Sequence, residues 1–330
     1  MKKVNTKKVN VSRILEKHSI LLILLVMIVI SSFLNQNFFT YGNIFNIMRQ
    51  LAVPTILAYG ASMLIISGMI DLSQGSVLAL SGTMAVMVFH ETDSLILSVL
   101  VALVIGVICN LLNALMVTYF NTPAFIATLA MQMVARGVAL SLTGGQNLLQ
   151  LGRFTVFGQG NVGPVPISLF IMLGITVIVW YILHHTRFGR SLYAMGGNQE
   201  AAIASGIQVS KNKYIVYAIN GLLVGLAGVL FMSRVNSGLP NGAVGFEMEG
   251  LTAAIIGGTS FSGGVGTAIG TLAGAFIIGI LNNIMNLIGV GSFTQQIVRG
   301  VIVALAVIWD IRSKNKKTKK IILAEDSVES

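Results

Sequence analysis

Ten apolar runs follow one another along this chain, and their lengths limit the folds open to it. The first is 20–34, and the others lie near 44–67, 73–89, 94–119, 124–143, 166–185, 214–235, 250–260, 266–288 and 293–311. A helix of about 20 apolar residues spans the hydrocarbon core of a bilayer. Hydrophobic residues make up 55% of the chain and charged residues only 10%, so the sequence predicts an all-α polytopic membrane protein with about ten transmembrane helices.

The first run follows a basic segment, as the apolar part of a signal peptide would. The residues after it read SSFLNQNFF and contain no small-residue cleavage site. We therefore expect this run to be retained as the first helix.

The basic residues are grouped, and the grouping predicts an orientation. Of the 21 Lys and Arg residues, 16 lie within 2–17, 187–213 and 312–320. Short loops rich in Lys and Arg remain on the cytoplasmic side, and an even number of crossings places both termini there. The expected organisation is a cytoplasmic tail at 1–18, a single transmembrane domain at 19–311 with a cytoplasmic loop at 186–213, and a second cytoplasmic tail at 312–330. The net charge of +10 thus indicates orientation and attraction to anionic lipid rather than nucleic-acid binding.

Within the cytoplasmic loop, 199–207 has the composition of one short helix. Ala-rich sequence favours a helix, Gly is suited to its end, and residues four apart share a face. Such a helix could fit a groove in a partner protein, although an ordinary connecting loop is the alternative. The residues of this candidate partner-binding helix are Glu200, Ala201, Ala202, Ile203, Gly206 and Ile207.

The motif Glu200-Ala201-Ala202 followed by Gly206 resembles the EAA loop of ATP-binding-cassette (ABC) importer permeases. Its flank HHTRFGRSLYAMGGN at 184–198 and the stretch PAFIATLAMQMVARG at 123–137 resemble the ribose-type sugar permeases. The run SGMIDLSQGS at 67–76 resembles their GIDLS-x-GS signature, with Met69 as an insertion. The resemblance covers about residues 35–311.

The resemblance implies the membrane subunit of a ribose, xylose or galactose importer. In that family the EAA loop forms a coupling helix, which seats in a cleft of the ATPase subunit and passes its motion to the membrane domain. An extracytoplasmic binding protein selects the sugar, and two permease copies form the channel, as a homodimer or with a paralogue. ATP is bound by the partner subunit, so no cofactor is expected in this chain.

Two glycine-rich stretches interrupt the pattern of plain spanning helices. The first is 67–82, where Asp71 either caps the next helix or marks a functional site, as intramembrane carboxylates often do. The second is 254–274, which either packs tightly or forms a broken pathway helix. Because IIGGTSFSGG in the second stretch echoes IISGMIDLSQG at 65–75, we expect broken or re-entrant helices and a possible internal repeat of five helices.

Several polar residues inside the apolar runs are candidates for a translocation path, and each has a structural alternative. Asn282 and Asn286 share a helix face and could bind sugar hydroxyls or hold neighbouring helices together. Arg136 could face a wet pathway or extend to the interface. Arg299 could pair with Asp71. The path candidates are Asp71, Ser73, Arg136, Asn282 and Asn286.

The longest predicted outer segments, 144–166 and 236–250, would meet a binding protein. Arg153 and Arg234 lie there, and either residue could pair with acidic groups on that protein or anchor the chain at the membrane interface.

Other function classes fit the sequence less well. A secondary transporter or channel for a small polar solute would need a proton or sodium relay, and the acidic residues are few and far apart. An ABC permease for a nucleoside or a branched-chain amino acid is the closer alternative. The sequence contains no G-x-x-x-x-G-K-[ST] motif for phosphate, no His-Glu metal cluster and no base-and-nucleophile arrangement, so we expect no ATPase, metal or catalytic site.

Overall fold

A computed structural model of the protein describes residues 19–329, and the predicted tail at 1–18 lies outside them. Within the described residues the structure consists of helices joined by turns and loops, together with one two-stranded antiparallel hairpin. The elements up to the hairpin are α2 (Ser19–Leu34), α3 (Tyr41–Ile66), α4 (Gln74–Thr92), α5 (Leu95–Thr118), α6 (Ala124–Thr143), the 3-10 helix η1 (Gly152–Thr155), α7 (Val156–Gln159), β1 (Asn161–Val162) and β2 (Val165–Pro166). They are followed by α8 (Ile167–His185), α9 (Arg187–Gly197), α10 (Gln199–Ala204), α11 (Val209–Val235), α12 (Phe246–Ile256), α13 (Ala268–Leu287) and α14 (Ser292–Glu329).

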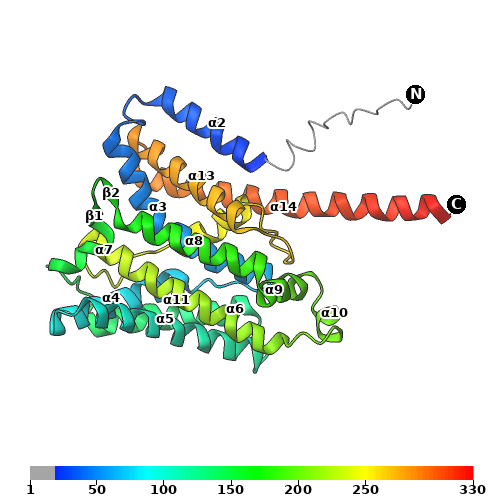
Figure 1. Ribbon diagram of the computed structural model, residues 1–330, viewed down its shortest axis with the longest axis horizontal. Helices are drawn as coiled ribbons and strands as arrows, with labels where there is room; N and C mark the ends of the chain where they lie inside the picture. The colour runs from blue at the N-terminus through cyan, green and yellow to red at the C-terminus, as the bar shows by residue number, and fades with distance from the viewer. Residues whose placement is uncertain (1–18, 330) are drawn as a thin grey trace, which may run out of the picture.

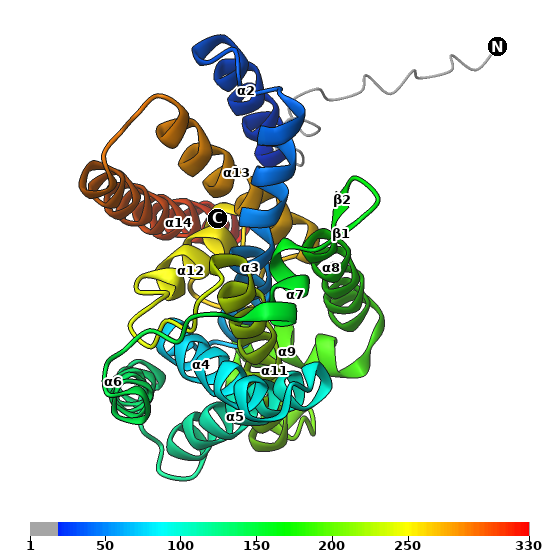
Figure 2. The same ribbon diagram turned by 90° about the vertical axis from the view of Figure 1, so that its left-hand side faces the viewer.

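The long helices lie side by side along one common direction, with α9 and α10 at one end and the β1–β2 hairpin at the other (Figure 1). Helix α11 occupies the centre and packs against α5, α3 and α4. In the view turned by 90°, α2, α13 and α14 lie on one side of α3, and α4 and α5 lie on the other (Figure 2).

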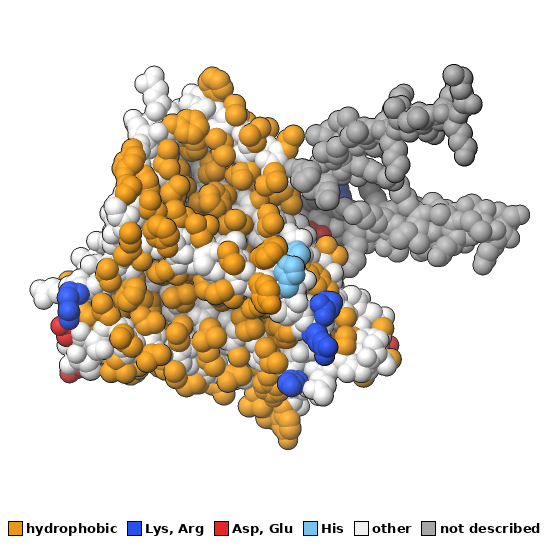
Figure 3. Space-filling view, viewed as in Figure 1, with side chains coloured by type: hydrophobic (Ala, Val, Ile, Leu, Met, Phe, Trp, Pro, Cys, Tyr) orange, Lys and Arg blue, Asp and Glu red, His pale blue; other side chains and the backbone are white. Residues whose placement is uncertain are grey.

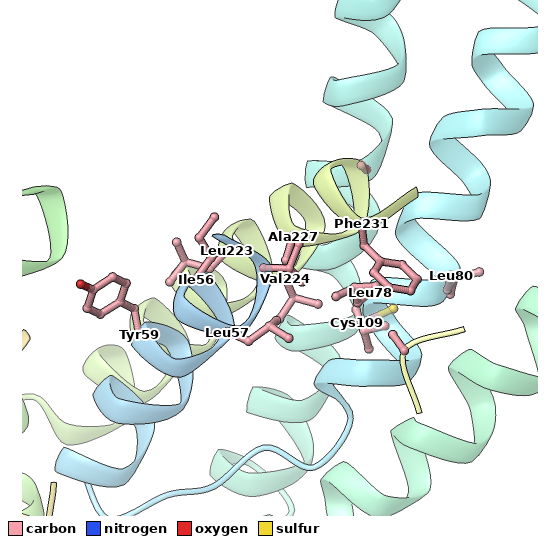
Figure 4. Packing of buried hydrophobic residues seen from close by; sticks show 14 of the residues in the cluster. Ile56, Leu57, Tyr59, Leu78, Leu80, Cys109, Leu223, Val224, Ala227 and Phe231 are labelled. Atoms are coloured by element: carbon pink, nitrogen blue, oxygen red, sulfur yellow. The ribbon is translucent and has the colours of Figure 1, made fainter. Parts of the chain in front are cut away.

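Small residues allow α11 and α5 to approach closely. A Cβ atom added at Gly221 would overlap the Gly106 carbonyl, and one added at Gly225 would lie 2.9 Å from the Ala102 carbonyl carbon. Close backbone approach is the usual basis of helix packing in membranes, where lipid removes the hydrophobic drive between helices. Around this contact, side chains of α3, α4, α5 and α11 form the main apolar core (Figure 4).

Apolar side chains also cover much of the outer surface. Among the described residues, seven helices are long and apolar enough to cross a membrane, namely α3, α5, α6, α8, α11, α13 and the Ser292–Arg312 part of α14, and α2 is a shorter apolar helix. Hydrophobic side chains spread across the visible face, while Lys and Arg gather near α9 and α10 (Figure 3). The predicted all-α polytopic membrane fold is confirmed.

Each of the ten apolar runs coincides with a helix, but ten crossings are not confirmed. Helix α12 has 11 residues and is about 16 Å long at 1.5 Å per residue, too short for a hydrocarbon core of about 30 Å. Its first turn contains Glu247 and Glu249, both buried. The helix predicted to begin near 250 therefore begins earlier, at Phe246, and Glu247 and Glu249 belong to it and not to the segment before it. That this segment faces outward stays a prediction.

The two glycine-rich breaks adopt the same backbone conformation, as their sequence echo predicts. After α3, Gly68 has φ +81° and the Met69 N–H donates to Leu64 O at 2.8 Å. After α12, Gly258 has φ +87° and the Thr259 N–H donates to Ala254 O at 3.0 Å. A left-handed glycine with this hydrogen bond ends a helix sharply. The five-helix repeat beyond these breaks stays a prediction.

The two predicted outer segments meet at the end of the bundle that lies opposite α9 and α10. Leu148 and Gly238 form an antiparallel bridge, with N–H to carbonyl oxygen distances of 2.9 and 2.8 Å. Segments 144–166 and 236–245 thus form one surface, which places them on the same side of the molecule.

Candidate functional site: a short loop helix and a polar cavity at opposite ends of the bundle

Helices α9 and α10 form a capped, compact unit. The Thr186 hydroxyl accepts from the Gly189 N–H at 2.9 Å and begins α9, and the Asn198 side chain accepts from the Ala201 N–H at 3.0 Å and begins α10. Short polar side chains at these positions satisfy N–H groups that have no partner within the helix. The helix predicted at 199–207 is present over Gln199–Ala204, and Gly206 follows with φ +80°.

Burial divides α10 into a packed side and an exposed side. Ala202 is buried in a cluster with Met195 and Val209, and Ile207 packs against that cluster. The side chain of Ile203 is 55% exposed. Ala202 was among the residues predicted for the partner-binding helix, but its side chain is not free for a partner, because it packs α10 against its own chain. The exposed residues of the helix are Gln199, Glu200, Ala201, Ile203 and Ala204.

The end of α9 lies against both helix breaks. A Cβ atom added at Gly196 would overlap the Ile66 carbonyl oxygen and lie 2.7 Å from the Gly264 nitrogen. The Gly264 N–H itself donates to Ile66 O at 2.9 Å. The Tyr193 hydroxyl donates to Gly266 O at 2.8 Å, and burial raises the pKa of Tyr193, so the hydroxyl remains a donor. We call this contact between Ile66, Gly196 and Gly264 the glycine junction.

A polar cavity of about 460 Å³ lies near the other end of the bundle, and we call it the outer cavity after the orientation that the sequence predicts. Its walls come from the first halves of α3 and α12, the first two turns of α14, the end of α11 and the second half of α13. Its polar lining consists of Asn46, Gln50, Arg234, Glu249, Asn282, Asn286, Gln295 and Arg299. The predicted shared face of Asn282 and Asn286 is confirmed, since both line this outer cavity.

The ion pair between Arg299 and Glu249 lies between the outer cavity and a neighbouring cavity. Arg299 Nη1 donates to Glu249 Oε1, and both residues also line a neighbouring cavity of about 520 Å³ between α12 and α14. The suggested pairing of Arg299 with Asp71 is therefore wrong. Arg234 lies in the first cavity, where its guanidinium donates to Gln50 O at 3.3 Å.

Asp71 and Ser73 lie in neither cavity but in a buried polar cluster beside α11. Asp71 Oδ1 accepts from the Ser73 N–H at 2.7 Å, and Asp71 Oδ2 accepts from Asn220 Nδ2 at 2.7 Å. Asn220 also donates to Asn110 Oδ1 at 2.8 Å, and Asn113 donates to Ser73 Oγ at 3.0 Å. The prediction that the Asp71 side chain caps the next helix is therefore wrong, because Ser73 is the N-cap of α4, no side chain caps that helix, and Asp71 binds the N–H and hydroxyl of Ser73 instead. These hydrogen bonds connect the segment between α3 and α4 to both α5 and α11.

Two further candidates make defined contacts at the end of the bundle opposite α9 and α10. Arg136 Nη1 donates to Pro240 O at 2.8 Å and to Gly242 O at 2.7 Å, which ties α6 to the segment before α12. Arg153 pairs with Asp93 at 2.5 Å, and both side chains are more than two-thirds exposed. Arg136 lines neither described cavity.

Sequence reasoning missed most of the outer cavity. The sequence offered one signal for these residues, which was their position. Each of Gln50, Glu249 and Gln295 lies in or directly beside an apolar run, near the predicted outer end of that run. Their convergence depends on helix packing, because Glu249 and Arg299 are 50 residues apart in the chain.

Comparisons with known proteins agree with this architecture. The family described as "Branched-chain amino acid transport system / permease component" matches residues 43–307. The chain is 42% identical to the ribose import permease of Escherichia coli strain K12 over 302 residues, which cover 90% of this chain and 93% of the relative. It is 39% identical to the ribose import permease of Bacillus subtilis strain 168, over 92% of this chain and 95% of the relative.

A third relative is the L-arabinose transport system permease of Escherichia coli strain K12. It is 32% identical over 308 residues, which cover 93% of this chain and 94% of the relative. Matches of this length, together with the membrane-spanning helices, show that the chain belongs to the permease family that includes the ribose and arabinose import permeases.

Proposed function

We propose that this chain is the membrane subunit of an ATP-driven importer of a monosaccharide, and that the sugar is ribose or a close relative. The names and identities of the ribose and arabinose permeases support this assignment over a nucleoside or a branched-chain amino acid. An extracytoplasmic binding protein would deliver the sugar, and a second permease copy, identical or paralogous, would complete the channel.

The exposed side of α10 is the observation that carries the ATP-driven mechanism. A short helix that presents Glu200, Ala201 and Ile203 beyond the bundle is suited to insertion in a groove of a partner. Glu200 lies in its first turn, where a negative charge is favourable beside the helix N-terminus. The ATPase subunit would bind ATP and move α10, so this chain would need no cofactor and no catalytic residue of its own.

Contacts inside the bundle offer a route from α10 to the solute path. Helix α10 packs on α9 through Ala202 and Met195, and α9 ends at the glycine junction, where both helix breaks meet. A displacement of α10 would therefore shift both breaks together. The outer cavity lies beyond the breaks and would receive the sugar from the binding protein.

Arg153 and Arg234 have different parts in this proposal. Arg153 is exposed on the outer surface beside Asp93 and could guide a binding protein by charge. Arg234 is only partly exposed and faces the outer cavity, so contact with sugar suits it better than docking.

A secondary transporter or channel is the rival function, and reconstitution separates the two. The chain, its ATPase and its binding protein are placed in proteoliposomes, and uptake of radiolabelled ribose is followed. We expect accumulation that requires ATP and the binding protein. Uptake driven by a proton or sodium gradient with the permease alone would contradict the proposal.

A further inference from the structure

We propose that the corner between α8 and α9 binds the anionic headgroup of a phospholipid, whose acyl chains lie on the exposed face of α8. This inference concerns the membrane around the chain and does not depend on which solute is transported. Histidine and basic side chains lie next to one another at this corner, on a surface that is otherwise largely hydrophobic (Figure 3).

The exposed face of α8 is suited to the hydrocarbon of a bilayer. The helix has 19 residues and is therefore about 28 Å long at 1.5 Å per residue, close to a hydrocarbon core of about 30 Å. Its buried residues share one face, and the opposite face is apolar and open. The exposed apolar residues are Phe170, Leu173, Val177, Ile178, Trp180 and Tyr181.

At the last turns of α8 this face becomes aromatic and then polar. Trp180 stacks on His184 with ring centroids 5.8 Å apart, and Tyr181 stacks on His185 at 5.6 Å. Trp and Tyr are enriched at membrane–water interfaces, where their rings lie at the level of the headgroups. Apolar, aromatic and imidazole side chains thus follow one another along the helix in the same order as hydrocarbon, interface and headgroup in a bilayer.

The start of α9 adds two positive charges directly after the histidines. Arg187 and Arg190 are exposed, and neither forms an ion pair with another described residue. The first turn of α9 contains no acidic residue, and the N-terminus of a helix itself carries partial positive charge, which disfavours cations there. An anion bound at this corner would offset all three charges. A phosphodiester is suited to it, because Arg binds phosphate oxygens through paired N–H donors.

The two arginines could instead contact a soluble partner that binds α10. The stacked rings favour lipid, because Trp180 and Tyr181 join the basic residues to the apolar face of α8, where lipid chains and not a soluble protein would lie. Helix α9 also packs on α10 and ends at the glycine junction. A headgroup bound at its start would therefore help to position both.

The test places a fluorescent reporter on the acyl-chain side of the corner. Val177 is 62% exposed and lies one turn before Tyr181, and the native Cys109 is buried, so a bimane label can be attached at Val177→Cys. Val104→Cys, on the exposed face of α5, is the matched control position. The permease assembled with its ATPase is placed in nanodiscs of phosphatidylcholine that contain the same fraction of brominated phosphatidylglycerol or brominated phosphatidylcholine, and quenching is measured.

We expect brominated phosphatidylglycerol to quench the label at Val177→Cys several-fold more than brominated phosphatidylcholine, and the two lipids to quench equally at Val104→Cys. Replacing Arg187 and Arg190 with Gln should remove the preference, and replacing both with Lys should retain part of it. Replacing Lys211 and Lys213 with Gln removes as much charge at the same end of the bundle and should leave the preference unchanged.

Three outcomes would overturn the site. Equal quenching by the two lipids at Val177→Cys would show no preference for an anionic headgroup, and equal loss in the arginine and lysine variants would show only a general surface charge. A preference that is present in the isolated permease and absent from the complex would assign the arginines to the ATPase interface.

Absence of quenching by either lipid would show that another protein chain covers this face, which would also contradict the proposal. None of these readouts requires solute uptake, so the site and the proposed function are tested separately.

Discussion

Gly206 follows the last turn of α10, and this position requires a left-handed backbone conformation. Its φ is +80° and a Cβ atom there would meet nothing within 4 Å, so a side chain at this position is opposed by backbone strain and not by a clash. Helix ends of this kind prefer Gly and tolerate Asn.

We predict that Gly206→Val reduces ribose uptake through a misdirected loop, at a local cost of about 1 kcal/mol or more. The amount of permease in the membrane should remain normal, because the residue lies outside the bundle. Uptake and membrane abundance are measured together, with Gly206→Asn as the milder control. Normal uptake in Gly206→Val would show that the loop conformation is unimportant.

The Glu249–Arg299 pair is a second residue-scale feature, and it links α12 to α14. Removing one partner of a fully buried pair costs about 3–5 kcal/mol. The Arg299 side chain is 37% exposed, so solvent screens the charge that would be left and the cost is smaller.

Glu249→Gln should therefore lower the thermal unfolding temperature of the purified permease, and Arg299→Gln should do the same. The double variant should be less destabilised than the sum of the two single changes, because neither charge is left alone. Unfolding is followed in detergent by intrinsic fluorescence. Additive effects would mean that the two side chains do not interact.

At the scale of elements, the glycine junction brings three backbone segments into contact without side chains. Gly196 and Gly197 make a matched pair, because a Cβ atom at Gly196 would overlap Ile66 O, whereas one at Gly197 would meet nothing within 4 Å. Neither residue has a positive φ, so a substitution at Gly196 differs from one at Gly197 only in the steric contact that the added side chain makes.

We predict that Gly196→Ala strongly reduces uptake, while Gly197→Ala transports nearly as well as the unchanged protein. The added methyl group would push α9 away from the two breaks. Uptake is normalised to membrane abundance, and ATPase co-purification is measured for both variants. Equal uptake by both variants would exclude the junction as a transmission contact.

The elements themselves were largely predictable, because hydropathy and helix-ending residues act locally. The apolar run at 94–119 corresponds to α5 at Leu95–Thr118, and the run at 124–143 matches α6. The sharp ends at Gly68 and Gly258 were also signalled by sequence. The burial of Ala202 was not, since it depends on the contact between α10 and α9.

Pairing between distant helices was beyond sequence reasoning. Asp71 binds Asn220, 149 residues away, and Arg299 binds Glu249 instead of Asp71. Polar side chains inside apolar runs signal a partner, but only the packing of helices determines which partner lies near. The outer cavity has the same origin.

For the whole molecule, the distribution of charge predicts an orientation. Arg187, Arg190, Lys211 and Lys213 surround α9 and α10, and from the positive-inside rule we expect that end to face the cytoplasm. The outer cavity and the 144–166 segment lie at the opposite end.

We predict that Asn241→Cys is labelled from outside intact cells by a membrane-impermeant maleimide, whereas Asn198→Cys is labelled only after permeabilisation. Both positions are exposed, so access to the reagent is the difference. The sole native cysteine is buried and serves as the unlabelled background. Labelling of Asn198→Cys in intact cells would reverse the orientation.

Coupling of ATP hydrolysis to sugar import through α10 is the central claim, and one paired measurement tests it most directly. Ribose uptake and phosphate release are recorded in the same proteoliposomes for the unchanged assembly and for Ile203→Asp, which places a charge on the exposed side of α10. We predict that the unchanged assembly imports ribose only with ATP, and that Ile203→Asp loses uptake and binds the ATPase weakly while the permease remains folded. Undiminished ATP-driven uptake by Ile203→Asp would contradict the account.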